Sequence, residues 1–296
     1  MLGGNSARRR GLILVLIAAV LWSSAGFFAR LIDHLDVWTM LCGRAFFGAL
    51  FLFVVAIVEW RRGILGPHLG LGPRMLPIVA LAAVAMTSYI AALKTTTVAE
   101  VMVIYATLPF VAAGLAFAVN RERTSARTLI AAGVALLGVL VMVASALGTG
   151  RLLGQAISLL MTAAFGLMIV LQRRHPGVSM TAINGMGAVV TALVGFGFSP
   201  AHPGVTLYDL CVLAAFGATT LCIAFFLFME GAKHIPPAEA GLIAMLDVVL
   251  GPLWVFLAFG EQPGPMAIVG GTLVLGALVW RLLPEIGGGR NGSAGE

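Results

Sequence analysis

The chain has 296 residues, of which 60% are hydrophobic and only 10% are charged, and its formal net charge is +6. So few charges exclude a soluble globular domain, and a mean hydropathy of +1.04 indicates a multi-pass membrane protein surrounded by lipid. The basic residues lie between apolar runs, where they orient membrane helices, so we expect no nucleic-acid partner.

Ten segments are long and apolar enough to cross a bilayer as helices. They cover residues 11–30, 37–59, 75–93, 97–119, 125–146, 152–172, 179–198, 207–229, 236–259 and 264–283. The first follows three arginines like a signal peptide, but it is as long as a full span and lacks a cleavage site, so we expect it to be retained. The sequence predicts an all-α membrane protein of ten transmembrane helices.

The basic residues also predict the orientation. With a cytoplasmic N-terminus, 14 of the 18 Lys and Arg residues fall on the inner side, one (Arg44) lies within a span, and the outer side carries Arg30, Lys94 and Arg151. Inner loops of membrane proteins are enriched in Lys and Arg. We therefore expect both termini in the cytoplasm, and a place in a bacterial inner membrane.

An internal repeat divides the chain. Residues Tyr89–Glu122 recur weakly, 139 positions later, at Phe228–Glu261. The markers of the repeat are Lys94/Lys233, Ala99-Glu100/Ala238-Glu239 and Glu122/Glu261. Five spans separate the copies, so the copies have opposite orientations. We place two inverted five-helix repeats at residues 11–146 and 152–283, an arrangement typical of transporters.

The order and spacing of these motifs resemble the EamA-type branch of the drug/metabolite transporter superfamily, and within it the YddG-type aromatic amino-acid exporters. The likeness is carried by Ala91–Lys94, Ala99-Glu100, Pro109, Glu122, Pro237–Glu239, Pro252 and Gly260-Glu261. The resemblance implies a central cavity lined by helices 1, 3, 4, 6, 8 and 9, and alternating access by rocking of the two halves. The first helix has no acid between Leu12 and Arg30, so the proton–drug exchange of the small four-helix exporters does not carry over.

Asp247 is the strongest candidate for a substrate contact. It lies near the middle of segment 236–259, and a charge at the bilayer centre costs on the order of 3 kcal/mol unless it faces a cavity or a partner. It would bind a substrate amino group or carry a proton; the alternative is a protonated acid bonded to a neighbouring helix. Further substrate candidates are aromatic and hydroxyl side chains that suit a flat amphipathic solute: Trp22, Ser23, Tyr89, Tyr105 and Phe165. Their alternative role is helix packing or an interfacial aromatic belt.

Four residues are candidates for gating or hinge motion. Glu100 and Glu239 would stand at the two mouths, but both also suit the first turn of a helix, and Thr97–Glu100 has the pattern of a capping box. Pro109 and Pro252 would kink their helices, either as hinges or as passive bends.

Three other charges have structural interpretations. Arg44 lies just inside the second segment, and its nearest acids in the sequence are Asp33 and Asp36, so we expect an ion pair with them or extension to the interface. Lys94 and Lys233 end the third and eighth segments, where each would cap the last carbonyls of its helix.

The sequence contains no phosphate-binding loop, nucleophile elbow or metal-ligand spacing, so we expect neither an enzyme nor a metal or cofactor. We expect a secondary transporter that exports small amphipathic metabolites, above all amino acids including aromatic ones. The alternatives are a broad exporter of drugs or toxic compounds and a non-transporting membrane scaffold or sensor. The fifth and tenth helices carry small residues that permit close packing, either within a monomer or between two copies in a homodimer: Gly133, Gly138, Gly271 and Gly276.

Overall fold

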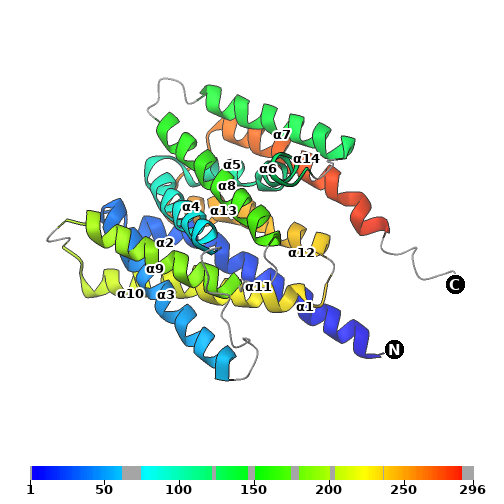
Figure 1. The fold of residues 1–296 in the computed structure, drawn as a ribbon. Helices are drawn as coiled ribbons and strands as arrows, with labels where there is room; N and C mark the ends of the chain where they lie inside the picture. The colour runs from blue at the N-terminus through cyan, green and yellow to red at the C-terminus, as the bar shows by residue number, and fades with distance from the viewer. Residues whose placement is uncertain are drawn as a thin grey trace.

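The computed structural model describes residues 2–61, 75–121, 125–145, 151–174, 180–200, 204–235 and 237–288. Throughout these residues the chain is helical and contains no strand, and the helices pack side by side in one bundle (Figure 1). The start of α1 and the end of α14 lie at the same end of the bundle (Figure 1). The helices are α1 (Leu2–Ser23), α2 (Ala25–Leu31), α3 (Val37–Arg61), α4 (Leu76–Thr95), α5 (Val98–Tyr105), α6 (Leu108–Asn120), α7 (Ala126–Ser145), α8 (Leu152–Arg173), α9 (Met180–Phe198), α10 (Leu207–Gly217), η2 (Ala218–Ile223), α11 (Ala224–Ala232), α12 (Pro237–Ala244), α13 (Leu246–Phe259) and α14 (Pro265–Gly288).

Seven helices in the described residues are long and apolar enough to cross a membrane, or eight if the bent pair α5 and α6 forms one span. The remaining apolar helices, Leu246–Phe259 and Pro265–Arg281, are shorter. Each of the ten segments predicted from the sequence coincides with one or more of the helices α1 to α14. The expectation of an all-helical, multi-pass membrane protein is confirmed, whereas the count of ten spans stays a prediction because several segments are divided by breaks.

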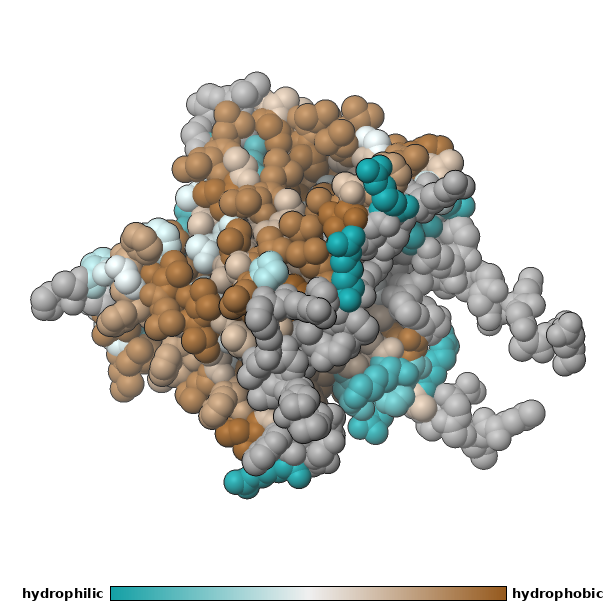
Figure 2. Space-filling view, viewed as in Figure 1, coloured by the Kyte–Doolittle hydropathy of each residue, from teal (hydrophilic) through white to brown (hydrophobic). Residues whose placement is uncertain are grey.

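The outer surface suits lipid rather than water. Large apolar side chains stand out from the bundle, among them Phe53, Leu153 and Phe196, which are 64%, 64% and 75% exposed. Figure 2 shows apolar residues over most of the coloured surface in view, with the strongly hydrophilic ones gathered toward the end where the chain termini lie. So large an apolar surface is stable in a membrane, where hydrocarbon is the solvent.

The repeat is visible in the helices themselves. A shift of 139 residues carries α5 (Val98–Tyr105) onto α12 (Pro237–Ala244), and each is followed by a short break and a second helix. The second helices, α6 and α13, then end before residues in the left-handed conformation, Arg121 with φ 57° and Gly260 with φ 69°. Both copies are therefore broken helices with equivalent ends, although the division of the chain into halves at 11–146 and 152–283 stays a prediction.

The copies differ in one local feature. Between α10 and α11 the chain forms the π-helical segment η2, whereas the corresponding part of the first copy lies within the regular helix α4. A π-helical turn widens the helix and often occurs at functional sites. A π-helical turn therefore occurs in the second copy and not at the corresponding place in the first.

Helices α7 and α14 pack against each other within the protomer. A Cβ atom on Gly138 would lie 2.7 Å from the carbonyl oxygen of Gly270, so these glycines allow the two backbones to touch. A Cβ atom on Gly133 or Gly276 would meet nothing within 4 Å. The predicted close approach within the protomer therefore exists, and the pair that makes it is Gly138 with Gly270. Gly133 and Gly276 make no such approach within the protomer, and a contact between two copies stays a prediction for them.

Candidate functional site

Arg44 lies in the interior of the bundle, two turns from the start of α3, and only 4% of its surface is exposed. Its Nη2 donates to Thr220 Oγ1 at 3.2 Å, and the guanidinium carbon lies 4.6 Å from the ring centre of Phe216 and 5.6 Å from that of Tyr89. A Cβ atom on Gly217 would lie 2.5 Å from the Arg44 carbonyl oxygen, so α10 passes directly against α3 here. The backbone of Arg44 is therefore held firmly in place.

The prediction that Arg44 pairs with Asp33 or Asp36 is wrong. Asp33 accepts from Lys94 Nζ at 2.8 Å, and Asp36 accepts from the backbone N–H groups of Trp38 and Thr39 at 2.8 and 3.1 Å. Both acids are thus engaged elsewhere, and within the described ranges no carboxylate forms an ion pair with Arg44. Its Nε atom is buried without a hydrogen-bond partner in the part of the chain that the structure describes.

Thr220, in η2, connects three helices beside Arg44. Its hydroxyl donates to the Phe216 carbonyl at 2.7 Å, which leaves the oxygen free to accept from Arg44. Its own carbonyl accepts from Trp22 Nε1 at 3.0 Å. The indole N–H of Trp22 is therefore bonded within the protein, and its ring packs 5.1 Å from that of Phe228.

Asp247 lies in the first turn of α13, directly after the break that separates α12 from α13 at Met245. It is half-buried, and its Oδ1 atom is buried without a hydrogen-bond partner among the described residues. Tyr89 and Tyr105 both lie close enough to interact with it electrostatically, and the Tyr105 ring lies 6.2 Å from the ring of Phe165. The structure thus brings together four of the predicted substrate residues.

Ser23 has a different setting. Its hydroxyl donates to the Val20 carbonyl at 2.7 Å and accepts from Trp254 Nε1 at 2.9 Å, and the side chain is buried. These bonds join α1 to α13. A substrate contact for Ser23 stays a prediction, and the structure gives it a role in helix packing.

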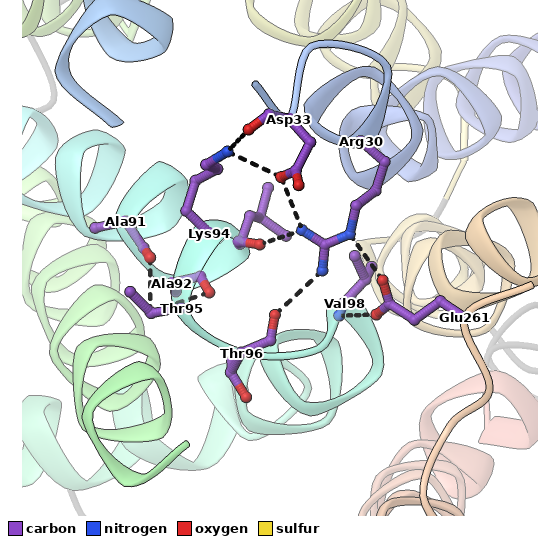
Figure 3. Close-up of polar contacts among 10 residues, drawn as sticks. Arg30, Asp33, Ala91, Ala92, Lys94, Thr95, Thr96, Val98 and Glu261 are labelled. Atoms are coloured by element: carbon purple, nitrogen blue, oxygen red, sulfur yellow. Dashed lines mark hydrogen bonds and ion pairs between the residues drawn. The ribbon is translucent and has the colours of Figure 1, made fainter. Parts of the chain in front are cut away.

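A group of charged residues joins helix ends at the opposite end of the bundle from the start of α1. This helix-end cluster, drawn in Figure 3, consists of Arg30, Asp33, Lys94 and Glu261. At its centre, Arg30 Nε donates to Glu261 Oε2 at 2.7 Å, with only 17% and 24% of the two side chains exposed. The rest of the guanidinium donates to the carbonyls of Leu93 at 2.7 Å and Thr96 at 3.3 Å. Arg30 thereby satisfies the carboxyl end of α4 as well as Glu261.

Glu261 connects the second copy of the repeat to the first. It follows α13, and its Oε1 atom accepts from the backbone N–H of Val98 at 2.9 Å, at the start of α5 (Figure 3). A carboxylate is favoured there because the amino end of a helix carries a partial positive charge. The contact holds the ends of α2, α4, α5 and α13 together.

Neither lysine caps its helix as predicted. Lys94 Nζ donates to the carboxylate of Asp33 at 2.8 Å and to the backbone carbonyl of the same residue. Lys233 Nζ donates to Glu230 Oε2 at 2.6 Å. The prediction that these lysines bind the last carbonyls of their helices is therefore wrong, because a nearby carboxylate is the stronger acceptor for an ammonium group.

Glu100 has the predicted helix-start geometry and an additional contact. Thr97 Oγ1 accepts from the Glu100 N–H at 3.2 Å, which confirms the predicted start of this helix. The buried carboxylate lies 3.3 Å from Arg151 Nη1, beside the start of α8, and accepts from the Thr96 hydroxyl. The side chain of Glu239 and the whole of Glu122 lie outside the described residues.

The two prolines lie in the second member of each broken helix. Pro109 is the second residue of α6, which is bent by 40° from α5, and Pro252 lies inside α13. A pocket opens between α3, α9, η2 and α11, but no predicted substrate residue lines it. The central cavity and the hinge roles stay predictions.

A lipid-facing bundle with two equivalent broken helices and with charges in its interior has the architecture of a membrane transporter. Residues 9–144 and 152–283 each match the EamA-like transporter family. The chain belongs to that family, whose members are membrane transporters of small solutes rather than enzymes.

The fold is also similar to that of solved proteins. One crystal structure, described only as "Crystal structure of protein", has a TM-score of 0.66 at 18% sequence identity, and the likeness covers 93% of this chain and 98% of the other. This similarity shows the fold alone. The comparison with curated protein sequences gives no match.

The sequence did not predict the contacts of three charged residues. Arg44 carried the same signal as Asp247, a charge within an apolar span, but two acids near it in the sequence suggested an ion pair. Glu261 was recognised only as a marker of the repeat, and Arg30 only as an outer basic residue. The two residues are 231 positions apart in the sequence, so no local pattern predicts their pairing.

Proposed function

We propose that the protein is a secondary transporter that exports small amphipathic metabolites, above all amino acids including aromatic ones. In this proposal it has ten spans, both termini lie in the cytoplasm, and the membrane is a bacterial inner membrane. The observation that carries the proposal is the Asp247 carboxylate, whose Oδ1 atom is buried without a partner among the described residues, near Tyr89 and Tyr105, with Phe165 against Tyr105. An ammonium group would pair with the carboxylate, and the rings would cover a flat apolar side chain.

The position of Asp247 supports a binding role. It lies where α12 gives way to α13, and broken helices at equivalent places in two repeats are the usual setting of a transporter's substrate site. The aligned residue of the first copy is Leu108, so only the second copy carries a charge there. The resemblance to YddG-type exporters points to the same class of substrate.

Alternating access would require the helix-end cluster to open. In the predicted orientation this cluster would face the outside, and its intact bonds support a state closed on that face. Outward opening would separate Glu261 from Arg30 and Val98, with α5/α6 and α12/α13 bending near Pro109 and Pro252. Substrate would drive the change only through a difference in its affinity for the two states.

Glu100 is a second link at the same face, because its pair with Arg151 joins α5 to the start of α8. Glu239, its counterpart in the repeat, would serve the inner face. Trp22 and Ser23 would shape the site by fixing α1 against η2 and α13. The functional unit would be a monomer, or a homodimer in contact through the exposed sides of α7 and α14.

Counterflow in proteoliposomes tests this proposal. Vesicles loaded with unlabelled phenylalanine should accumulate labelled phenylalanine, and Asp247→Asn should raise the apparent KM about tenfold or more, because a charge-assisted bond is lost. Glu230→Gln, which removes an acid paired with Lys233 at the other end of the bundle, is the matched control and should leave KM unchanged.

Repeating the assay with and without a pH gradient determines whether protons are coupled. Transport of cationic drugs without any amino acid would favour the broad exporter, and no flux of any solute would favour the scaffold or sensor. If Asp247→Asn leaves every amino acid unaffected, Asp247 is not the substrate contact.

A further inference from the structure

Two charged side chains of opposite sign are incompletely partnered in the interior of the bundle. Arg44 Nε and Asp247 Oδ1 are both buried without a hydrogen-bond partner in the described part of the chain. No ion pair joins the two residues there, yet the Tyr89 side chain interacts electrostatically with both. Both charges therefore lie near Tyr89 without pairing with each other.

Such an arrangement is costly in an empty protein. A buried guanidinium without a carboxylate or phosphate loses its hydration and gains little in return, and one bond to a threonine uses only one of its five N–H donors. The rings of Phe216 and Tyr89 offset part of the cost through cation–π contacts. They cannot supply the hydrogen-bond acceptors that a guanidinium requires.

The structure also explains why the protein itself does not complete the pair. Asp33 is bound by Lys94, and Asp36 is bound by Trp38 and Thr39. Helix α9, which packs along α3, carries no charged residue. Helix α10 also packs along α3, and its one acid, Asp209, accepts from Thr206 and pairs with His34. None of these described acids therefore pairs with Arg44.

We propose that Arg44 binds the carboxylate of the transported solute while Asp247 binds its ammonium group, so that the site selects zwitterions. Nε and one terminal nitrogen of a guanidinium together hold both oxygens of a carboxylate, a geometry that a lysine cannot reproduce. Thr220 binds one terminal nitrogen of the guanidinium, and the Tyr89 ring, 5.6 Å from the guanidinium carbon, interacts electrostatically with both charges. This inference rests on the proposed export of amino acids and adds the carboxylate half of the site.

The test compares compounds that differ by one charge. Phenylalanine carries both charges, phenethylamine lacks the carboxylate, phenylalaninamide has a neutral group of the same shape, and 3-phenylpropionate lacks the ammonium. Each would compete for labelled phenylalanine in proteoliposomes that contain the full chain. The wild-type protein should bind phenylalanine at least tenfold more tightly than either the amine or the amide, since a charge-assisted contact is lost in both.

Variants then assign the preference to Arg44. Arg44→Gln should weaken phenylalanine binding tenfold or more while leaving phenethylamine nearly unchanged, so that the preference for the carboxylate disappears. Arg44→Lys should recover only part of it. Arg61→Gln is the matched control, because Arg61 is on the same helix but exposed at its far end, and the preference should remain.

The outcomes separate this inference from the proposal on which it rests. If phenylalanine is transported but phenylalaninamide competes equally well in the wild-type protein, the role of Arg44 is overturned while amino-acid export stands, and this result needs no variant to fold. A folded Arg44→Gln protein that keeps the preference overturns the role as well. If 3-phenylpropionate binds through Arg44 and no amino acid is carried, the carboxylate site stands and amino-acid export fails. Transport of amines alone overturns both.

Discussion

The helix-end cluster and the interior pair of Arg44 and Asp247 treat charge in opposite ways. In the cluster each guanidinium nitrogen of Arg30 donates to Glu261 or to a backbone carbonyl, and both oxygens of Glu261 accept hydrogen bonds. In the interior, a guanidinium and a carboxylate each keep a buried atom without a partner in the described residues. Buried charges that are fully hydrogen-bonded make a structure rigid, whereas a buried charge without a full set of partners is costly unless another group, such as a ligand, supplies them.

The contrast divides the molecule into an end whose charges are paired and an interior whose charges are not fully paired. Breaking the cluster costs several bonds at once, so the cluster stabilises the state seen here. Filling the interior gains bonds without breaking any. A solute that binds both charges would therefore shift the balance of states, provided that it binds them better in one state than in the other.

The largest effect is expected from breaking the centre of the cluster. Arg30→Gln or Glu261→Gln should each lower the free energy of unfolding by about 2 kcal/mol, because each leaves a half-buried charge without its partner. The double variant should lose little more than either single one, since the same interaction is removed. Thermal unfolding of the purified protein in detergent measures these differences.

Asp33 tests whether burial makes the Arg30–Glu261 pair stronger than the exposed part of the cluster. This carboxylate is 61% exposed, so Asp33→Asn should change stability by less than about 0.5 kcal/mol. If Asp33→Asn costs as much as Glu261→Gln, burial is not what makes the centre of the cluster strong. Additive losses in the double variant would show that Arg30 and Glu261 act independently.

A smaller effect is expected from Gly138, which belongs to neither region. Gly138→Leu would place a side chain against the Gly270 carbonyl, where a Cβ atom alone would already lie 2.7 Å away, so stability should fall by about 1.5 kcal/mol. The apparent KM for phenylalanine should not change, because α7 and α14 pack outside the interior site. This separates a loss of stability from a loss of binding.

Gly133→Leu is the control, since a Cβ atom there would meet nothing within 4 Å. It should leave both stability and KM unchanged. An altered KM in Gly138→Leu alone would mean that the α7–α14 contact is coupled to the site, and that the interior is less independent of its surroundings than its contacts indicate.

Local chemistry made much of the fold predictable. Apolar runs located the helices, the Thr97–Glu100 pattern located the start of α5, and the repeat located α12 and α13. The breaks were harder to predict. Pro109 lies next to the break before α6, but Pro252 lies inside α13, beyond the break at Met245. The π-helical turn in η2 has no signature in its own residues, and its Thr220 bonds to Trp22 and Arg44, which are distant in the sequence. A helix can be predicted from its own residues, whereas its irregularities depend on its neighbours.

The candidate site was predictable only in part, for the same reason. Asp247 was found because a lone acid in an apolar span is costly wherever it lies. Arg44 was misjudged because proximity in the sequence placed Asp33 and Asp36 near it, although the chain turns both acids toward other partners. Whether a buried charge is paired depends on which residues the fold brings next to it, and not on its neighbours in the sequence.

Apart from the controls at Asp33 and Gly133, the smallest loss of stability is expected from Asp36, the acid that sequence proximity had assigned to Arg44. Its carboxylate binds the first N–H groups of α3, so Asp36→Ala should cost about 1 kcal/mol, as the loss of a helix cap does. Partial burial raises the pKa of Asp36, but hydrogen bonds from Thr39 and Trp38 lower it by more, so that the net pKa lies below its ordinary value. The folded state therefore favours the charged form.

A lowered pKa stabilises the fold above the pKa of the unfolded chain, roughly 3.9, and this contribution is lost as the pH falls through the folded value. The difference in melting temperature between the wild-type protein and Asp36→Ala should accordingly be full at pH 7 and shrink below about pH 4. The preference for phenylalanine over phenylalaninamide should stay the same in the variant. Should Asp36→Ala weaken that preference as Arg44→Gln does, Asp36 would be the missing partner of Arg44, the interior charge would be satisfied by the protein itself, and the contrast between the two regions would disappear.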